Sequence, residues 1–383
     1  MTKREKHILL VTACLAFCAL YAPQPILPGL AAHFGVSHSQ ISLLISASLL
    51  PLGLAPILYG YLIEAVPARL LLFWALLILA VSQIAFAFAN DYSVLLASRI
   101  VQGFCFPAIF TAVTTYFSAA AEQASVRRVM STYVATTIVG GFAGRFSSGL
   151  ISDIVDWRAT FVVLGLALFA CMLAIAKLPA TTRIDFSRID IRAAKRVLEQ
   201  GVFRHGLLTI FFAFFVFAAM LNGLPFRLKD IDPTISDLMI ALVYAGYIYG
   251  VMIAVSSARI SQILGGDIST MRLGAVLLAI ATAAFGATGV LLSLLNMLLF
   301  VTGMFLIHAV LAGYLNHQAA ENKGMLNGLY ISFYYLGGAA GSWLPTLIYG
   351  HYGWSAFIGG LLVLCGACVV SIERLGKAKT INR

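Results

Sequence analysis

The sequence predicts an all-α membrane protein in which twelve transmembrane helices form two pseudo-symmetric six-helix bundles. Apolar residues make up 61% of the 383 residues and charged residues only 10%. A soluble protein of this composition would expose far too much apolar surface. Apolar segments of about 20 residues, the length that spans a bilayer, follow one another along almost the whole chain. The two halves of the chain also resemble each other.

Short connections separate the predicted spans and leave no room for a catalytic or nucleic-acid-binding domain. We divide the chain into a first bundle at 1–178, a linker at 179–205 and a second bundle at 206–383. The twelve spans are predicted at 8–31, 40–65, 69–89, 93–118, 129–152, 158–177, 206–226, 237–258, 270–288, 291–317, 325–349 and 355–373. The first is too long for a signal peptide and lacks a small-residue cleavage site.

Basic residues are distributed asymmetrically over the loops. Of the 25 Lys and Arg residues, 20 fall in the N-terminus, in alternate loops and in the C-terminus, three in the opposite loops and two within spans. Because basic residues accumulate on the cytoplasmic side, both termini are predicted to be cytoplasmic. We expect a multi-pass protein of a bacterial inner membrane, a monomer in contact with membrane lipid. The net charge of +10 then reflects this orientation, and no nucleic acid is expected to bind.

The six cysteines all fall within apolar segments. Cys365 and Cys368 have a CxxC spacing, but no second pair and no nearby histidine in a polar loop accompanies them. Their interpretation as small packing residues is favoured over metal or redox chemistry. The sequence therefore predicts no metal and no cofactor.

An internal repeat appears at a constant offset of 197 residues. Eight of twenty positions agree between 140–159 and 337–356, among them Gly140 with Gly337 and Gly144 with Gly341. Such a parallel duplication places a pseudo-two-fold axis along the membrane normal, with a solute site between the halves near the midplane. The linker between the halves alternates apolar and basic residues, which is typical either of an amphipathic helix on anionic lipid or of a solvated connection.

Small and helix-breaking residues mark the places where the predicted helices approach or bend. Gly140, Gly144 and Gly149 in the fifth span, and Gly337 and Gly341 in the eleventh, would let backbones come close, either as static packing or as seams that slide. Prolines in the first and seventh spans free backbone carbonyls, which is tolerated only beside protein or a water-filled cavity. Gln24 and Asn222, which neighbour these prolines, are therefore candidate solute contacts.

Two charges lie well inside predicted spans, Arg99 and Arg145. A charge within the membrane costs several kcal/mol unless it is paired, so such residues usually have a function. No acidic residue lies near a span centre, so the interior of the bundle has a net positive charge. This balance favours a neutral or anionic solute over a lipophilic cation, with Arg99 and Arg145 as its electrostatic partners. The alternative is that each arginine bonds backbone carbonyls and joins helices.

His308 is the one histidine within a predicted span, and a histidine titrates near neutral pH. It is either a proton relay or a hydrogen-bonded structural residue. Tyr330 and Tyr334 lie on one face of the eleventh span, where they could line a cavity or, alternatively, face the lipid interface. Tyr133 matches Tyr330 at the repeat offset and is placed with them along the pathway.

The sequence resembles the major facilitator superfamily over essentially its whole length. Arg99, Gln102 and Gly103 match the family's R-x-x-Q-G element in the fourth span. The resemblance implies the major facilitator fold and a proton-coupling or gating role for Arg99, with Gln102 along the pathway and Gly103 in helix packing. The glycine-rich fifth span resembles the antiporter element of the family, although Arg145 stands where a proline is usual.

The loop between the second and third spans resembles the family's cytoplasmic gate. Gly60, Glu64 and Arg69 keep the outer glycine, an acid and the final base of the pattern G-x-L-x-D-R-x-G-R-R/K, whereas the middle arginine and glycine are missing. The resemblance implies that Glu64 latches the cytoplasmic side, without the usual charge relay. The Trp157-Arg158 pair and the tyrosines of the eleventh span resemble sugar-efflux and multidrug-like exporters.

These observations favour a secondary transporter that exports a small organic compound by alternating access, with protons as coupling ion. Import or exchange of an organic anion is the nearest alternative. A receptor would carry a sizeable signalling domain, and an enzyme would show a convergent nucleophile, acid or metal set. Neither feature occurs in the sequence, so we expect no enzymatic activity.

Overall fold

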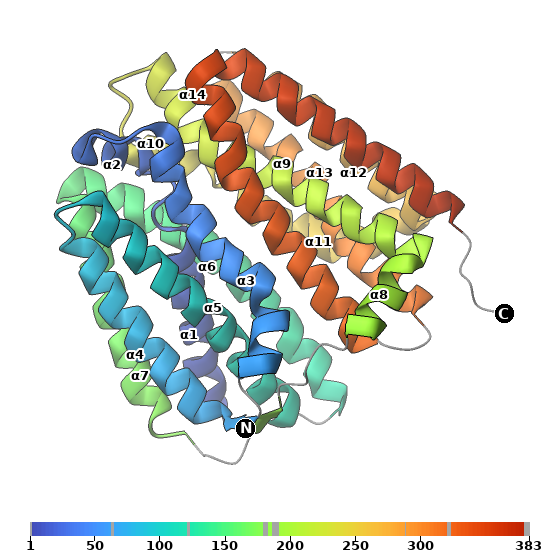
Figure 1. The fold of residues 1–383 in the computed structure, drawn as a ribbon, viewed down its shortest axis with the longest axis horizontal. Helices are drawn as coiled ribbons and strands as arrows, with labels where there is room; N and C mark the ends of the chain where they lie inside the picture. Colours follow the sequence, from blue (N-terminus) through green and yellow to red (C-terminus); the bar gives the residue numbers. More distant parts are fainter. Residues whose placement is uncertain are drawn as a thin grey trace.

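The computed structural model describes residues 2–62, 65–120, 123–178, 183–185, 191–287, 289–319 and 323–378. The first bundle contains α1 (Lys3–Tyr21), α2 (Leu27–Phe34), α3 (His38–Leu62), α4 (Ala68–Ala87), α5 (Tyr92–Ala120), α6 (Gln123–Ile154) and α7 (Trp157–Ile175). The second contains α9 (Gly201–Ile231), α10 (Asp237–Val243), α11 (Gly246–Ile263), α12 (Asp267–Ala284), α13 (Val290–Gln318) and α14 (Lys323–Lys377). Figure 1 shows the two bundles side by side, with the helices of the second running obliquely to those of the first.

Within the described chain, nine helices are long and apolar enough to cross a membrane, and α14 is long enough to cross twice. Gly353 divides α14, because its φ of 78° lies in the left-handed region that glycine adopts without strain. α1 is not among the nine because charged residues fill its first turn, and α6 is more polar because it carries Arg145 and several hydroxyl groups. With α1 and α2 forming one span and α10 and α11 another, the helices make twelve crossings, and the predicted fold class is confirmed.

The helix breaks follow from local chemistry. Proline has no backbone N–H and kinks or breaks a helix. α1 therefore ends at Tyr21, before Pro23 and Pro25, and the chain resumes as α2 with Pro28 in its first turn. The first predicted span is thus two helices joined by an irregular segment, whereas α9 continues through Pro225.

Helix packing within each bundle leaves a defined junction between them. α1 packs against α6, and α4 packs against α5 and α7; in the second bundle α9 packs against α14, and α12 against α13. Contacts between the bundles join α3 to α14, α6 to α10 and α11, and α2 to α9. We call the end with α2 and the start of α10 the outer end, following the predicted orientation.

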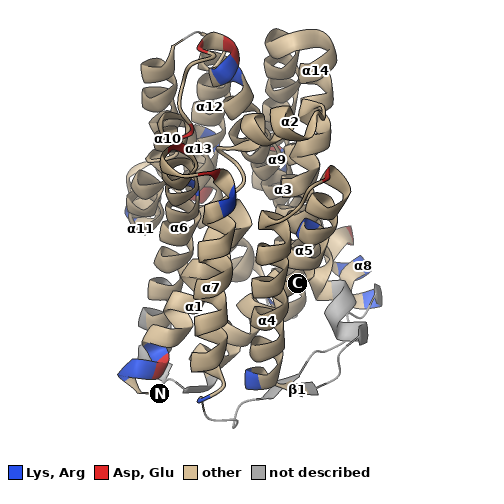
Figure 2. Ribbon diagram, turned by 90° about the vertical axis from the view of Figure 1, so that its left-hand side faces the viewer, with Lys and Arg blue, Asp and Glu red and all other residues tan. Residues whose placement is uncertain are grey.

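The connection between the bundles contains one described strand and a helix, and this strand pairs with another that lies between α3 and α4. β1 (Ala65–Pro67) pairs antiparallel with β2 (Arg183–Asp185), and α8 (Ile191–Glu199) packs against α9 and α14. Ala193 and Val197 share the buried face of α8, and Lys195 is exposed. Lys and Arg residues, blue in Figure 2, occur in α8, at the start of α1 and at the start of α4. Contact of α8 with lipid stays a prediction.

Candidate functional site

Arg145 lies at the junction of the two bundles and is fully buried. Its guanidinium carbon lies 4.2 Å from the ring centroid of Tyr21, 4.8 Å from that of Tyr247 and 5.1 Å from that of Tyr244. Tyr21 ends α1 in the first bundle, whereas Tyr244 and Tyr247 flank the break between α10 and α11 in the second. Ring faces attract cations, so these three tyrosines partly compensate a charge that has left water.

The hydrogen bonds of Arg145 leave one donor unused. Nε donates to Oε1 of Gln24 at 2.7 Å, and Nη1 donates to the carbonyl oxygen of Gly141 at 2.7 Å. Nη2 is buried without a hydrogen-bond partner among the described residues, although the Tyr247 hydroxyl lies near the guanidinium. No described carboxylate pairs with Arg145. The site therefore holds a positive charge that could accept an anionic partner.

A buried hydrogen-bond chain continues from Arg145 into the second bundle. The Gln24 amide donates to Oδ1 of Asn222 at 3.1 Å, and the Asn222 amide donates to the carbonyl oxygen of Ser342 at 2.8 Å. All four residues are at most 1% exposed. Ser342 matches Arg145 at the repeat offset, and Asn222 directly follows the position that matches Gln24. Equivalent segments of the two halves thus meet at one point.

Arg99 lies inside the first bundle and contacts two neighbouring helices. Nη1 donates to the carbonyl of Ala19 at 3.0 Å, Nη2 to that of Leu20 at 2.7 Å and Nε to that of Leu44 at 2.9 Å. Nη1 also donates to Oε1 of Gln102 at 2.7 Å. The Gln102 amide in turn donates to the carbonyl of Ser82 on α4. Arg99 and Gln102 therefore join four helices, and their roles in coupling or substrate binding stay predictions.

Aromatic side chains of α13 and α14 face the same junction from the second bundle. Tyr330 Oη lies 2.9 Å from Nδ1 of His308, and the Tyr334 ring centroid lies 5.0 Å from the His308 ring and 3.7 Å from that of Phe214. His308 and Tyr334 keep intermediate exposure, as does Tyr21 in the first bundle. These three side chains are therefore less buried than Arg145 and Gln24.

Tyr133 belongs to the first bundle and is 9% exposed. Its ring centroid lies 6.1 Å from that of Phe117, within the same bundle. Tyr335 was not among the predicted site residues.

The predicted packing glycines lie at close backbone contacts. A Cβ at Gly140 or Gly144 would come within 3.0 Å of the backbone of α1, and a Cβ at Gly337 or Gly341 within 3.0 Å of the backbone of α9. The partners obey the repeat offset, because Cys14 and Cys18 correspond to Phe211 and Phe215. Both bundles therefore contain the same close helix contact.

Two further glycines lie at different contacts. A Cβ at Gly103 would lie 2.6 Å from the carbonyl oxygen of Ala47 on α3, within the first bundle. At Gly149 it would lie 2.5 Å from the carbonyl oxygen of Asp237 on α10, across the bundle junction. Gly149 therefore lets the bundles approach at their outer end.

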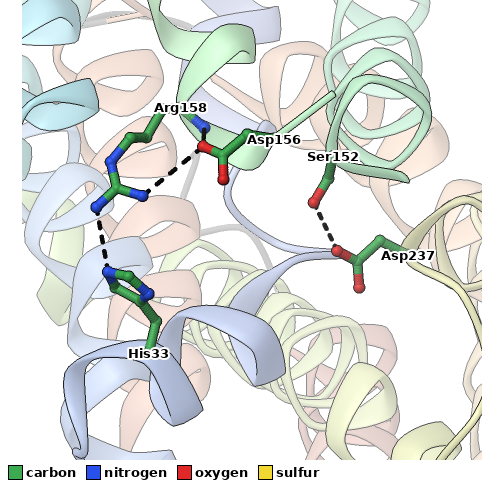
Figure 3. Close-up of polar contacts among 5 residues, drawn as sticks. All are labelled: His33, Ser152, Asp156, Arg158 and Asp237. Carbon is green, nitrogen blue, oxygen red and sulfur yellow. Dashed lines mark hydrogen bonds and ion pairs between the residues drawn. The ribbon is translucent and has the colours of Figure 1, made fainter. Parts of the chain in front are cut away.

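Acidic side chains fasten the same outer end, a feature that the sequence did not reveal. Asp153 on α6 accepts hydrogen bonds from the backbone N–H groups of Asp237 and Leu238 at 2.9 and 3.0 Å, and thereby caps α10 of the other bundle. Ser152 donates to Asp237 at 2.7 Å, as Figure 3 shows. Because these bonds cross the junction, outward opening would have to break them.

Substitution of Asp153 by asparagine is expected to weaken the outer closure by about 1 kcal/mol, or roughly five-fold in the closed-to-open ratio, because asparagine keeps only one of the two acceptor oxygens. The neutral amide interacts less favourably with the N-terminus of α10. Labelling rates of a cysteine introduced near the outer end would report the change. The control is Asp156→Asn, because Asp156 caps α7 within one bundle. Equal labelling rates in the two variants would contradict the role of Asp153.

The predicted cytoplasmic gate is only partly within the described structure. Glu64 lies outside the described residues, and at Gly60 only the helical backbone is described. Arg69 donates to the carbonyl oxygen of Leu178 at 2.9 Å, which ties the start of α4 to the chain after α7. Among the described residues, no three His, Cys, Asp or Glu side chains converge as a metal site requires.

Comparisons with known proteins agree with this architecture. The sequence profile of the Major Facilitator Superfamily matches residues 9–341. The inner membrane transport protein YnfM of Escherichia coli (strain K12) is 27% identical over 93% of this chain and 88% of its own length. The multidrug efflux protein YfmO of Bacillus subtilis (strain 168) is 24% identical over 94% and 91%. A crystal structure of a D-xylose-proton symporter superposes with a TM-score of 0.78 at 14% identity, covering 98% and 97%.

The profile covers most of the chain, and the chain belongs to the Major Facilitator Superfamily. It is a membrane transporter of a small molecule, not an enzyme. The predicted family is confirmed.

Proposed function

We propose that this transporter exports a small organic compound, preferably an anion, in exchange for protons by alternating access across a bacterial inner membrane. The observation that carries the proposal is Arg145, a buried cation at the bundle junction with an unused Nη2 donor and no described carboxylate partner. An anion would supply the missing acceptor and neutralise the charge. Similarity to YfmO, which is named a multidrug efflux protein, supports the outward direction.

Alternating access is supported by the distribution of contacts. At the outer end the bundles are joined by the Asp153 and Ser152 bonds to α10 and by the Gln24–Asn222 bond. Tyr21 of the first bundle and His308 and Tyr334 of the second keep intermediate exposure, which is consistent with side chains that line a pathway. A carrier of this kind would release the outer bonds when it opens outward and reform them on return.

His308 is the proposed group for proton coupling. An imidazole can both accept and donate a proton, and His308 keeps intermediate exposure in the second bundle and meets the Tyr330 hydroxyl. Arg99 is the alternative that the family resemblance implies. Its Nε, Nη1 and Nη2 all donate to acceptors of the first bundle, which supports a positioning role for it instead.

Transport in everted membrane vesicles tests direction and charge together. With an imposed inside-acid gradient, organic anions are expected to accumulate in vesicles that contain the protein, and cations of the same series are not. Arg145→Gln removes the charge at similar size and should lower anion accumulation about 10-fold or more. Arg259→Gln, at an exposed position on α11, is the matched control.

Import or exchange of an organic anion is the second candidate function, because a positively charged site can bind an anion during transport in either direction. It predicts that anions leave preloaded everted vesicles along the proton gradient, or that they exchange without one. Cation transport that persists in Arg145→Gln would contradict both versions.

A further inference from the structure

Tyrosines from both bundles gather around the junction beside Arg145. Tyr21 comes from the first bundle, and Tyr247, Tyr334 and Tyr335 come from the second. The Tyr21 and Tyr247 rings lie 4.2 and 4.8 Å from the guanidinium carbon of Arg145. Ring contacts then link Tyr247 through Phe217 and Phe214 to Tyr334. Among the described residues, no ring contact joins Tyr21 to the other three tyrosines, so Tyr21 and Tyr247 meet the same guanidinium without packing on each other.

The second bundle holds these tyrosines in a rigid arrangement. Tyr334 stacks on Phe214 with ring centroids 3.7 Å apart and planes 12° apart, and its edge meets Tyr335 at 5.0 Å and 89°. Tyr247 packs against Phe217 at 5.6 Å. Tyr334 and Tyr335 nevertheless keep intermediate exposure. Preorganised aromatic rings that remain accessible bind flat π-systems better than they bind aliphatic groups of similar size.

The polar groups of the site restrict the ligand further. Gln24 and Asn222 bond to each other, and Asn222 also bonds to Ser342. Their amides are therefore not free to form hydrogen bonds with the many hydroxyl groups of a sugar. Nη2 of Arg145, which is fully buried, is an unused charged donor of the site, and the only other group of this hydrogen-bond chain without a partner among the described residues is the Ser342 hydroxyl. One anionic group and one flat apolar body match this combination.

We propose that the transported compound is a planar aromatic anion, with its carboxylate on Nη2 of Arg145 and its ring among Tyr21, Tyr334 and Tyr335. This inference rests on the proposed function, in which the same site carries an anion. It adds that the site selects for the ring and that Tyr334 determines this selectivity.

The test compares three probes of matched shape for competition with tritiated 2-naphthoate on the purified full-length protein. The probes are 2-naphthoate, its decahydro derivative, which keeps the carboxylate and both rings but loses the flat π-system, and 2-naphthamide, which keeps the π-system but loses the charge. We expect the decahydro acid to compete about 3- to 10-fold more weakly and the amide about 10-fold or more weakly than 2-naphthoate. Tyr334→Leu should remove most of the difference between the two acids, and Tyr334→Phe should keep it.

The other possible results contradict different parts of the proposal. Equal competition by the two acids, with a weaker amide, overturns the aromatic selectivity but leaves the proposed anion transport intact. An amide as strong as 2-naphthoate overturns the role of Arg145 and with it the proposed function. Absence of saturable 2-naphthoate binding at millimolar concentration overturns the inference. Because Tyr334→Phe keeps the ring stack, its behaviour separates loss of selectivity from loss of folding.

Discussion

Replacement of Arg99 by lysine or alanine is expected to destabilise the protein by about 3 kcal/mol or more and to lower transport at least about ten-fold. Arg99 donates to the carbonyl oxygens of Ala19 and Leu20 at the end of α1. Within the helix the Ala19 carbonyl would be bonded by the N–H of residue 23, which is a proline and has none. The N–H that would serve Leu20 belongs to Gln24 and instead bonds Tyr21. Arg99 thus satisfies two carbonyls that the helix break leaves without backbone partners.

The lysine variant is the sharper of the two tests, because it keeps the charge. A single ammonium nitrogen cannot form all the hydrogen bonds that the planar guanidinium donates to α1, α3 and Gln102. Thermal unfolding of the detergent-solubilised protein measures the loss, with Arg259→Lys as the exposed control. If Arg99→Lys unfolds at the temperature of the control while proton coupling alone is lost, the carbonyl-binding account is wrong and the coupling role is supported.

The fold could be predicted from sequence because few backbone structures are stable within lipid. A chain with apolar segments almost end to end must form helices that satisfy their own backbone groups, and the repeat then fixes two equivalent bundles. The contacts of Gly144 with α1 and of Gly341 with α9 agree with that repeat residue by residue. The ends of the helices were less predictable: the first span breaks at Pro23 and α9 begins at Gly201, because a hydropathy pattern does not locate turns.

The central polar residues could be predicted for an energetic reason. A charge within a span is costly, which selects Arg145, and the prolines of the first and seventh spans select the neighbouring Gln24 and Asn222. The structure brings these three into one hydrogen-bond chain. The outer Asp153 cap could not be predicted, because acidic residues at helix ends are common and sequence does not show which helix they meet. Tyr21 was missed because sequence does not show that its ring meets Arg145 of another helix.

Alanine at Gly144 or Gly341 is expected to destabilise the protein by about 2 kcal/mol or more and to abolish most transport. At Gly144 the new Cβ would meet the backbone of Cys18, and at Gly341 that of Phe215. Backbone atoms of a packed helix cannot move aside as a flexible side chain can, so the two helices of each pair must separate. Thermal unfolding and vesicle transport measure the two effects.

The control is Gly359→Ala, at an exposed position on α14 where a Cβ meets nothing within 4 Å. That change should be neutral or slightly stabilising, because alanine favours the helix. The repeat adds a further requirement: since Gly144 and Gly341 occupy equivalent contacts in the two bundles, their alanine variants should lose similar stability. If either variant unfolds at the same temperature as Gly359→Ala, the helices can separate there without loss of stability. That result would contradict the symmetric close packing of α1 on α6 and of α9 on α14.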